Sequence, residues 1–305
     1  MGADVLQQNA GARSPLLPVR LLGMGWIASR LGLGTHSLHR LLLPAGRRRL
    51  LAAAYDLGVR YFDTASSYGA GLAEREIGRI LSKRRSELVL ATKFGIPPGR
   101  LASVLPAGAY LAAARGAALK FVRLKDITRN VPRRNYSTAA MLRSLEGSLR
   151  RLRTDYIDVL YLHAPGADCP SEADQLVSAL EALRTAGKIR YVGLSGEVGN
   201  CFAIARGCPA LAEVLQVEVP ADPKDLPSAA PLPPEASIGF WEFPTPPPGQ
   251  PEWPFVQTLD RLHRAVPTGM ILLSTRILAV IEEATKQLAG AEAASGGRPA
   301  PGFSS

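Results

Sequence analysis

The sequence is poor in cysteine, with only Cys169, Cys201 and Cys208, and their positions match no metal-ligand spacing. An odd number of cysteines without a secretory leader indicates reduced thiols rather than a disulfide framework. No apolar run approaches the length of a membrane span. The first residues, MGADVLQQNAGARS, contain neither the apolar core of a signal peptide nor a myristoylation signal. These absences predict a soluble cytoplasmic protein without a metal.

Acidic residues are outnumbered, and the formal net charge is +10 over 305 residues. A basic balance is compatible with nucleic acid, an anionic membrane or a phosphorylated ligand. The arginines are spread along the chain, however, and neither zinc-finger spacing nor an RNA-binding aromatic pattern is present. We therefore expect a diffuse basic surface that binds neither nucleic acid nor membrane.

Short apolar runs rich in Val, Ile, Leu, Tyr and Phe recur and predict buried parallel strands. They cover residues 31–35, 59–65, 87–95, 155–163, 188–196, 212–219, 236–243 and 268–275. Segments with helical spacing lie between most of them, at 45–58, 73–84, 136–153, 171–187, 255–266 and 276–288. Strands that alternate with helices form right-handed crossovers. The pattern predicts an α/β protein, a single (β/α)8 barrel domain over 1–290 followed by a disordered tail over 291–305.

Two segments interrupt this rhythm. Residues 96–136 form a long insertion after the third predicted strand, and residues 220–254 are rich in proline. The proline density excludes a regular helix before the seventh strand. Loops make the substrate pocket of a barrel, so these segments are expected to shape it.

Polar residues stand where the predicted strands end, which in such a barrel is the functional edge. Asp63, Lys93 and His163 end the second, third and fourth strands, and Tyr68 follows in a loop. A tyrosine hydroxyl has an ordinary pKa of about 10, and a neighbouring ammonium lowers it. Lys93 would supply that cation, Asp63 would hold it, and His163 would donate a hydrogen bond to a substrate oxygen.

Each of these residues alone has an ordinary structural explanation. A lone lysine at a strand end is usually solvated or ion-paired, a lone histidine is usually a hydrogen-bonded structural residue, and an aspartate often caps a turn. Four such residues at consecutive strand ends of one barrel are a much less probable accident. The combination predicts a proton-transfer site.

The chain resembles the aldo-keto reductases. The resemblance rests on LGLGT, FDTASSYG, LVLATKFG, DYIDVLYLH and GKIRYVGLSG, between residues 31 and 196. It implies a (β/α)8 barrel that reduces aldehydes or ketones with NADPH and without a metal. It also implies that Asp63, Tyr68, Lys93 and His163 form the catalytic tetrad, and that the partner is a small carbonyl compound.

The resemblance also implies cofactor contacts. Ser195 and Gln216 match the residues that contact the nicotinamide carboxamide, and Trp241 takes the place of the aromatic that stacks on its ring. Ser274, Thr275 and Arg276 lie at the end of the eighth strand, where Arg276 is the nearest candidate for the adenosine 2′-phosphate. This stretch departs from the family signature, and Gly196 stands where the family often has asparagine. Binding of NADH is therefore possible beside NADPH.

Two other functions are compatible with the residues alone. One is a barrel that binds a nucleotide and serves as a sensor or interaction module with little turnover, which the departures in the cofactor motifs favour. The other is a Schiff-base enzyme with Lys93 as nucleophile. Trapping with borohydride in the presence of a carbonyl compound would distinguish the latter.

Overall fold

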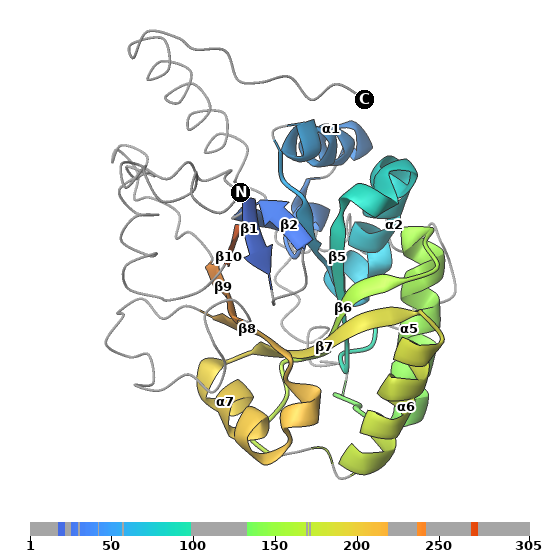
Figure 1. Ribbon diagram of the computed structural model, residues 1–305. Helices are drawn as coiled ribbons and strands as arrows, with labels where there is room; N and C mark the ends of the chain where they lie inside the picture. The colour runs from blue at the N-terminus through green and yellow to red at the C-terminus, as the bar shows by residue number, and fades with distance from the viewer. Residues whose placement is uncertain are drawn as a thin grey trace, which may run out of the picture.

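A computed structural model describes residues 18–21, 26–29, 31–41, 43–56, 58–98, 133–168, 170, 172–218, 237–241 and 270–273. Eight strands form a closed barrel in the order β10-β3-β4-β5-β6-β7-β8-β9, all paired in parallel (Figure 1). The strands are β3 (Leu31–Gly34), β4 (Tyr61–Asp63), β5 (Val89–Phe94), β6 (Ile157–His163), β7 (Ile189–Gly196), β8 (Val214–Glu218), β9 (Ser237–Trp241) and β10 (Met270–Leu273). The prediction of a (β/α)8 barrel is confirmed, with all eight strands.

Helices cross over between successive strands on the outside of the barrel (Figure 1). They are α1 (Pro44–Asp56), α2 (Leu72–Leu81), α5 (Thr138–Leu152), α6 (Ala173–Thr185) and α7 (Val198–Gly207). The first four confirm predicted helices. The fifth, α7, was missed, and no Ser, Thr, Asp or Asn stands at its start to indicate a helix there. Glu197 caps it instead and accepts hydrogen bonds from the amides of Gly199 and Asn200.

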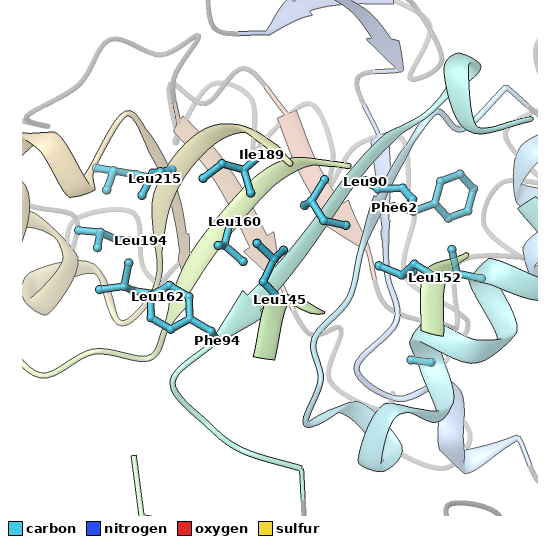
Figure 2. Packing of buried hydrophobic residues seen from close by; sticks show 14 of the residues in the cluster. Phe62, Leu90, Phe94, Leu145, Leu152, Leu160, Leu162, Ile189, Leu194 and Leu215 are labelled. Carbon is cyan, nitrogen blue, oxygen red and sulfur yellow. The ribbon is translucent and has the colours of Figure 1, made fainter. Parts of the chain in front are cut away.

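The main core lies between the strands and this helical layer. Side chains alternate along a strand, so every second residue of β4 to β8 faces the helices. Leu90, Leu160, Leu162, Leu194 and Leu215 are such residues, and each is at most 2% exposed (Figure 2). Full burial of one leucine contributes about 1.5–3 kcal/mol. The alternation leaves the intervening residues of the same strands to fill the barrel and its mouth.

Two tyrosines fill the barrel interior below its mouth. Tyr61 and Tyr161 are fully buried, and their hydroxyl oxygens lie 3.0 Å apart. Burial raises the pKa of both phenols far above the ordinary value, so both stay neutral. Gly193 makes room for this pair, because a Cβ there would lie 2.6 Å from the ring of Tyr161. The tyrosine pair closes the barrel beneath Asp63, two residues along β4.

The helices pack so closely that an added methyl group at one glycine is expected to destabilise the protein. A Cβ on Gly78 of α2 would lie 2.4 Å from the carbonyl oxygen of Arg151, whereas one on Gly46 of α1 would meet no atom within 4 Å. We expect Gly78→Ala to lower the free energy of unfolding by about 1–3 kcal/mol through overpacking. Gly46→Ala is the matched control and should raise it by up to about 1 kcal/mol. Urea unfolding of both variants checks this, and a stable Gly78→Ala protein would contradict the close contact.

A hairpin precedes the barrel and was not predicted. The strands β1 (Pro18–Leu21) and β2 (Trp26–Ser29) pair antiparallel, from Pro18 opposite Ser29 to Leu21 opposite Trp26. Each is four residues long, and neither PVRL nor WIAS forms a longer apolar run of the kind that predicted the barrel strands.

The two ends of the insertion after the third barrel strand lie next to each other. The amide of Asn135 donates a hydrogen bond of 2.8 Å to the carbonyl of Gly95, so the chain re-enters the fold beside the carboxyl end of β5. Residues 99–132, most of the proline-rich segment 220–254, the predicted helices 255–266 and 276–288 and the tail 291–305 lie outside the described residues. None of the helices that the structure describes combines the length and apolarity needed to cross a bilayer.

Candidate active site

Lys93 and Asp63 form a buried ion pair at the mouth of the barrel. The ammonium lies 2.6 Å from Oδ1 and 2.5 Å from Oδ2 of Asp63, and it also donates to the carbonyl of Thr64 at 3.0 Å. The side chains of Lys93 and Asp63 are 1% and 4% exposed. Their strands are neighbours in the barrel, which is why residues 30 positions apart meet. Lys93 has no other described acidic partner at this mouth.

Tyr68 lies against this pair. It begins a tight 3-10 turn, Tyr68–Gly71, in which Gly69, Ala70 and Gly71 all have positive φ angles, of 55°, 57° and 82°. Two of these three positions are glycines, which reach that region without steric cost. The turn brings the chain back over the mouth, where Nζ of Lys93 lies 4.7 Å from the centre of the Tyr68 ring. The five-residue gap between Asp63 and Tyr68 is thus the length of this return.

The neighbours of Lys93 decide its charge. Burial alone would lower the pKa of the Lys93 ammonium, but the carboxylate of Asp63 and the contact with Tyr68 outweigh it and raise that pKa above its ordinary value. Lys93 is therefore a fixed cation at neutral pH. A fixed cation beside a phenol favours the phenolate form of that phenol.

His163 completes the cluster from the end of β6. Its ring meets the ring of Tyr68 edge to face, with centres 5.6 Å apart. Burial, and next to it the charge of Lys93, lowers the pKa of His163 to about 3. The imidazole is consequently neutral at neutral pH and donates from a single nitrogen. Its Nδ1 makes no hydrogen bond to any residue that the structure describes.

The lowered pKa of His163 has a consequence for stability. Between about pH 6.5 and pH 3 the unfolded chain binds a proton at this histidine that the folded protein does not bind. Acidification through this window therefore lowers the free energy of unfolding. The His163→Gln variant lacks the imidazole that takes up this proton. Its free energy of unfolding, measured by urea titrations at pH 7, 5.5 and 4.5, should therefore fall less steeply as the pH is lowered. Above about pH 7 the free energies of unfolding of the unaltered protein and the variant should change with pH in parallel. Identical slopes below pH 7 would contradict a lowered pKa at His163.

Ser195 and Gln216 stand beside His163 on the next two strands. The pairing register places His163 opposite Ser195 and Ser195 opposite Gln216. Both are buried, and a hydrogen bond joins the Gln216 side chain to Asp63. Oε1 of Gln216 has no hydrogen-bond partner among the described residues. A buried, unsatisfied amide oxygen is costly in isolation, and it fits a ligand that brings an N–H donor, such as a carboxamide.

The other residues assigned to the cofactor from the sequence are less fully placed. Trp241 ends β9, and its backbone pairs with Leu273 of β10, whereas its side chain lies outside the described part of the chain. Ser274, Thr275 and Arg276 lie outside the described residues altogether. Their roles stay predictions.

Two residues near the site were missed from the sequence. His36 is exposed, two residues past the end of β3, and its ring meets that of Tyr68 edge to face at 5.1 Å. Its position after a strand end could have identified it, by the same rule that selected Lys93. Tyr136, two residues before α5, donates a hydrogen bond from its hydroxyl to the backbone carbonyl of His163. No sequence pattern marks that contact.

A hollow of about 540 Å³ lies at the opposite end of the barrel, where β6 and β7 begin. It is lined by Tyr156, Arg184, Gly187, Ile189, Arg190 and Tyr191. Both arginines that line it are ion-paired, Arg190 with Asp158 at 2.9 Å and Arg184 with Glu213 at 2.7 Å. The candidate catalytic residues lie at the other end of the barrel. Groups of three or more potential metal ligands are absent from the described residues.

Comparison with known proteins identifies the family of the chain. The sequence model of the aldo/keto reductase family matches residues 30–201, more than half of the chain, and the protein therefore belongs to this family. Aldo-keto reductase AMT2 of Alternaria alternata is 36% identical over 165 residues, which are 51% of this chain and 41% of that protein. Pyridoxal 4-dehydrogenase of Microbacterium luteolum is 32% identical over 200 residues, covering 57% and 54% of the two chains.

The solved structures support the fold. The holo form of aldo-keto reductase AKR11C1 from Bacillus halodurans superposes with a TM-score of 0.61 at 20% identity, over 89% of this chain and 91% of that one. The curated relatives are matched over a smaller part, since the chain spans about half or less of their length.

Proposed function

We propose that the protein reduces an aldehyde or a ketone to the alcohol with NADPH. The observation that carries the proposal is the buried Lys93–Asp63 pair with the rings of Tyr68 and His163 against it. A fixed cation, a phenol and a neutral imidazole at one barrel mouth are what protonation of a developing alkoxide requires. NADPH, when bound, would supply the hydride that goes to the carbonyl carbon.

The residues then divide the proton chemistry among them. Tyr68 donates its proton to the carbonyl oxygen as negative charge grows there. Lys93 stabilises the tyrosinate that is left, and Asp63 holds Lys93 charged and in place. His163 is neutral, so it donates a hydrogen bond to the same oxygen and orients the carbonyl without adding a charge.

For the cofactor we propose Ser195 and Gln216 as the contacts of the nicotinamide carboxamide. The unsatisfied Oε1 of Gln216 supports this, because a carboxamide nitrogen would satisfy it. Trp241 would stack on the ring, and Ser274, Thr275 and Arg276 would hold the adenosine phosphates. NADH is a possible second cofactor, since the stretch Ser274 to Arg276, where the 2′-phosphate of NADPH would bind, departs from the family signature.

The Schiff-base alternative is disfavoured by the charge of Lys93. A nucleophilic lysine must be neutral, whereas the ammonium of Lys93 donates to both oxygens of Asp63 and has a raised pKa. Borohydride with a carbonyl compound should therefore leave no adduct at Lys93.

One experiment tests the proposal and separates it from a nucleotide sensor. Tryptophan fluorescence is titrated with NADPH and with NADH, with Trp241→Phe as the control for which tryptophan reports. NADPH oxidation is then followed with 4-nitrobenzaldehyde and with a panel of carbonyl compounds. Binding with turnover supports the reductase, binding without turnover over the whole panel favours the sensor, and absence of binding overturns both.

A further inference from the structure

The residue after His163 has an unusual backbone. Ala164 has φ = 49°, in the left-handed region that residues with a Cβ seldom adopt. Such a conformation costs about 1–3 kcal/mol and persists only where the surroundings impose it. Its position, directly after a candidate active-site histidine, raises the question of what imposes it.

The hydroxyl of Tyr136 hydrogen-bonds to the backbone at this kink. It lies 2.8 Å from the carbonyl oxygen of His163 and 3.0 Å from that of Ala164, so its one proton is shared between two successive carbonyls. From the other side, the amide of Ala164 donates to the carbonyl of Ser195 at 2.6 Å. The backbone at residues 163 and 164 is therefore tied both to Tyr136, just before α5, and to β7.

Two glycines make this arrangement possible. A Cβ on Gly95, whose φ is +108°, would lie 2.1 Å from the ring of Tyr136, so only glycine lets the ring lie there. A Cβ on Gly196 would lie 3.0 Å from the Cα of Ala164, which is tighter than an ordinary contact. Gly196 is also the residue that departs from the asparagine common in the family.

These four residues, Tyr136, Gly95, Ala164 and Gly196, are called the Tyr136 latch below. The latch joins the ends of β5, β6 and β7 to the start of α5, where Ser137 caps the helix by accepting from the amide of Ala140. The ring of His163 has no hydrogen bond at Nδ1 to orient it within the described residues. Its placement therefore depends on its own backbone and on packing against Tyr68.

We propose that Tyr136 is a positioning residue that fixes the imidazole of His163 through the backbone of residues 163 and 164. The proposal rests on the proposed function, in which His163 orients the carbonyl. Loss of the Tyr136 hydroxyl frees the kink at Ala164 and lets the imidazole tilt. The hydrogen bond from His163 to the reacting oxygen then weakens, while the cofactor contacts at Ser195 and Gln216 stay in place.

The test uses Tyr136→Phe, which keeps the ring on Gly95 and removes only the hydroxyl. We expect kcat for carbonyl reduction to fall about tenfold, equivalent to about 1.4 kcal/mol, with an unchanged Kd for NADPH. Tyr191→Phe, which loses a hydroxyl at the opposite end of the barrel, is the matched control and should keep the unaltered kcat. A kcat for Tyr136→Phe within twofold of the unaltered protein would overturn the proposal.

A double-variant cycle distinguishes positioning from a general loss of packing. If Tyr136 acts through His163, Tyr136→Phe has little further effect on kcat in a His163→Gln background. The same tenfold loss in both backgrounds would show that Tyr136 acts by another route and would refute the proposal.

A third measurement needs no turnover, so it stays informative if the proposed function fails. Nuclear magnetic resonance follows the titration of each imidazole. The chain has four histidines, and the imidazole signals of His163 are assigned by their disappearance in His163→Gln. In the unaltered protein His163 should stay neutral well below the ordinary histidine pKa of about 6.5. In Tyr136→Phe its titration should move upward, toward that value, as the ring gains water. An unmoved titration together with an unaltered kcat refutes the latch, whereas a moved titration in a protein without reductase activity refutes only the proposed function.

Discussion

The Tyr68→Phe variant is expected to bind NADPH as the unaltered protein does and to lose about 10²–10⁴-fold in kcat for carbonyl reduction, the range that one general acid contributes. The phenyl ring keeps the edge-to-face contacts with His163 and His36. Only the hydroxyl, the group that we propose gives the proton, is removed. The measurement is steady-state oxidation of NADPH with 4-nitrobenzaldehyde, together with the fluorescence titration for binding.

Two features of the rates identify the cause of the loss. Because the hydroxyl acts only as charge develops on the oxygen, kcat and kcat/KM should fall together. Tyr191→Phe again serves as the control, since it removes a hydroxyl far from the barrel mouth. If Tyr68→Phe kept the unaltered rate, Tyr68 would not be the acid, and the proposed role of Lys93 would fail with it.

Much of the fold could be predicted because each strand and helix of a barrel has its own local sequence pattern. Each strand is a short apolar run, and each of the helices α1, α2, α5 and α6 has its own apolar spacing. Parallel strands also end at a shared edge, so residues that end neighbouring runs must meet. That rule is why Asp63 and Lys93, 30 positions apart, could be paired before any contact was seen.

The unpredicted parts depend on contacts between distant segments. Tyr136 reaches the carbonyl of His163, 27 positions away, from a position at the edge of the insertion. Gly95 and Gly196 look like ordinary loop and strand-end glycines until the ring of Tyr136 and the kink at Ala164 are placed against them. Such requirements are set by space, which no local pattern of residue types records.

The buried pair of Asp63 and Lys93 is expected to give the second large effect, on stability. Removal of one partner leaves the other as an uncompensated charge in a site that water hardly reaches. Asp63→Asn and Lys93→Met should each lower the free energy of unfolding at pH 7 by about 3–5 kcal/mol. The double variant leaves no charge, so its loss should be smaller than the sum of the two single losses. Urea unfolding of the three variants measures the cycle.

The dependence on pH separates an unpaired charge from a mere loss of packing. In Lys93→Met the buried carboxyl group of Asp63 is protonated more readily in the folded protein than in the unfolded chain. Its folded pKa is raised, so the folded state binds more protons and stability is lost as pH rises. In Asp63→Asn the buried ammonium of Lys93 has a lowered pKa, and stability is gained as pH rises.

The two single variants should therefore respond to pH in opposite directions. Lys93→Met should be less destabilised at pH 5 than at pH 8, and Asp63→Asn less destabilised at pH 9 than at pH 6. The double variant carries neither group and should follow neither trend. If both single variants showed the same pH dependence as the double variant, Asp63 and Lys93 would not be a charged pair. Lys93 would then be no fixed cation and could not stabilise the phenolate of Tyr68.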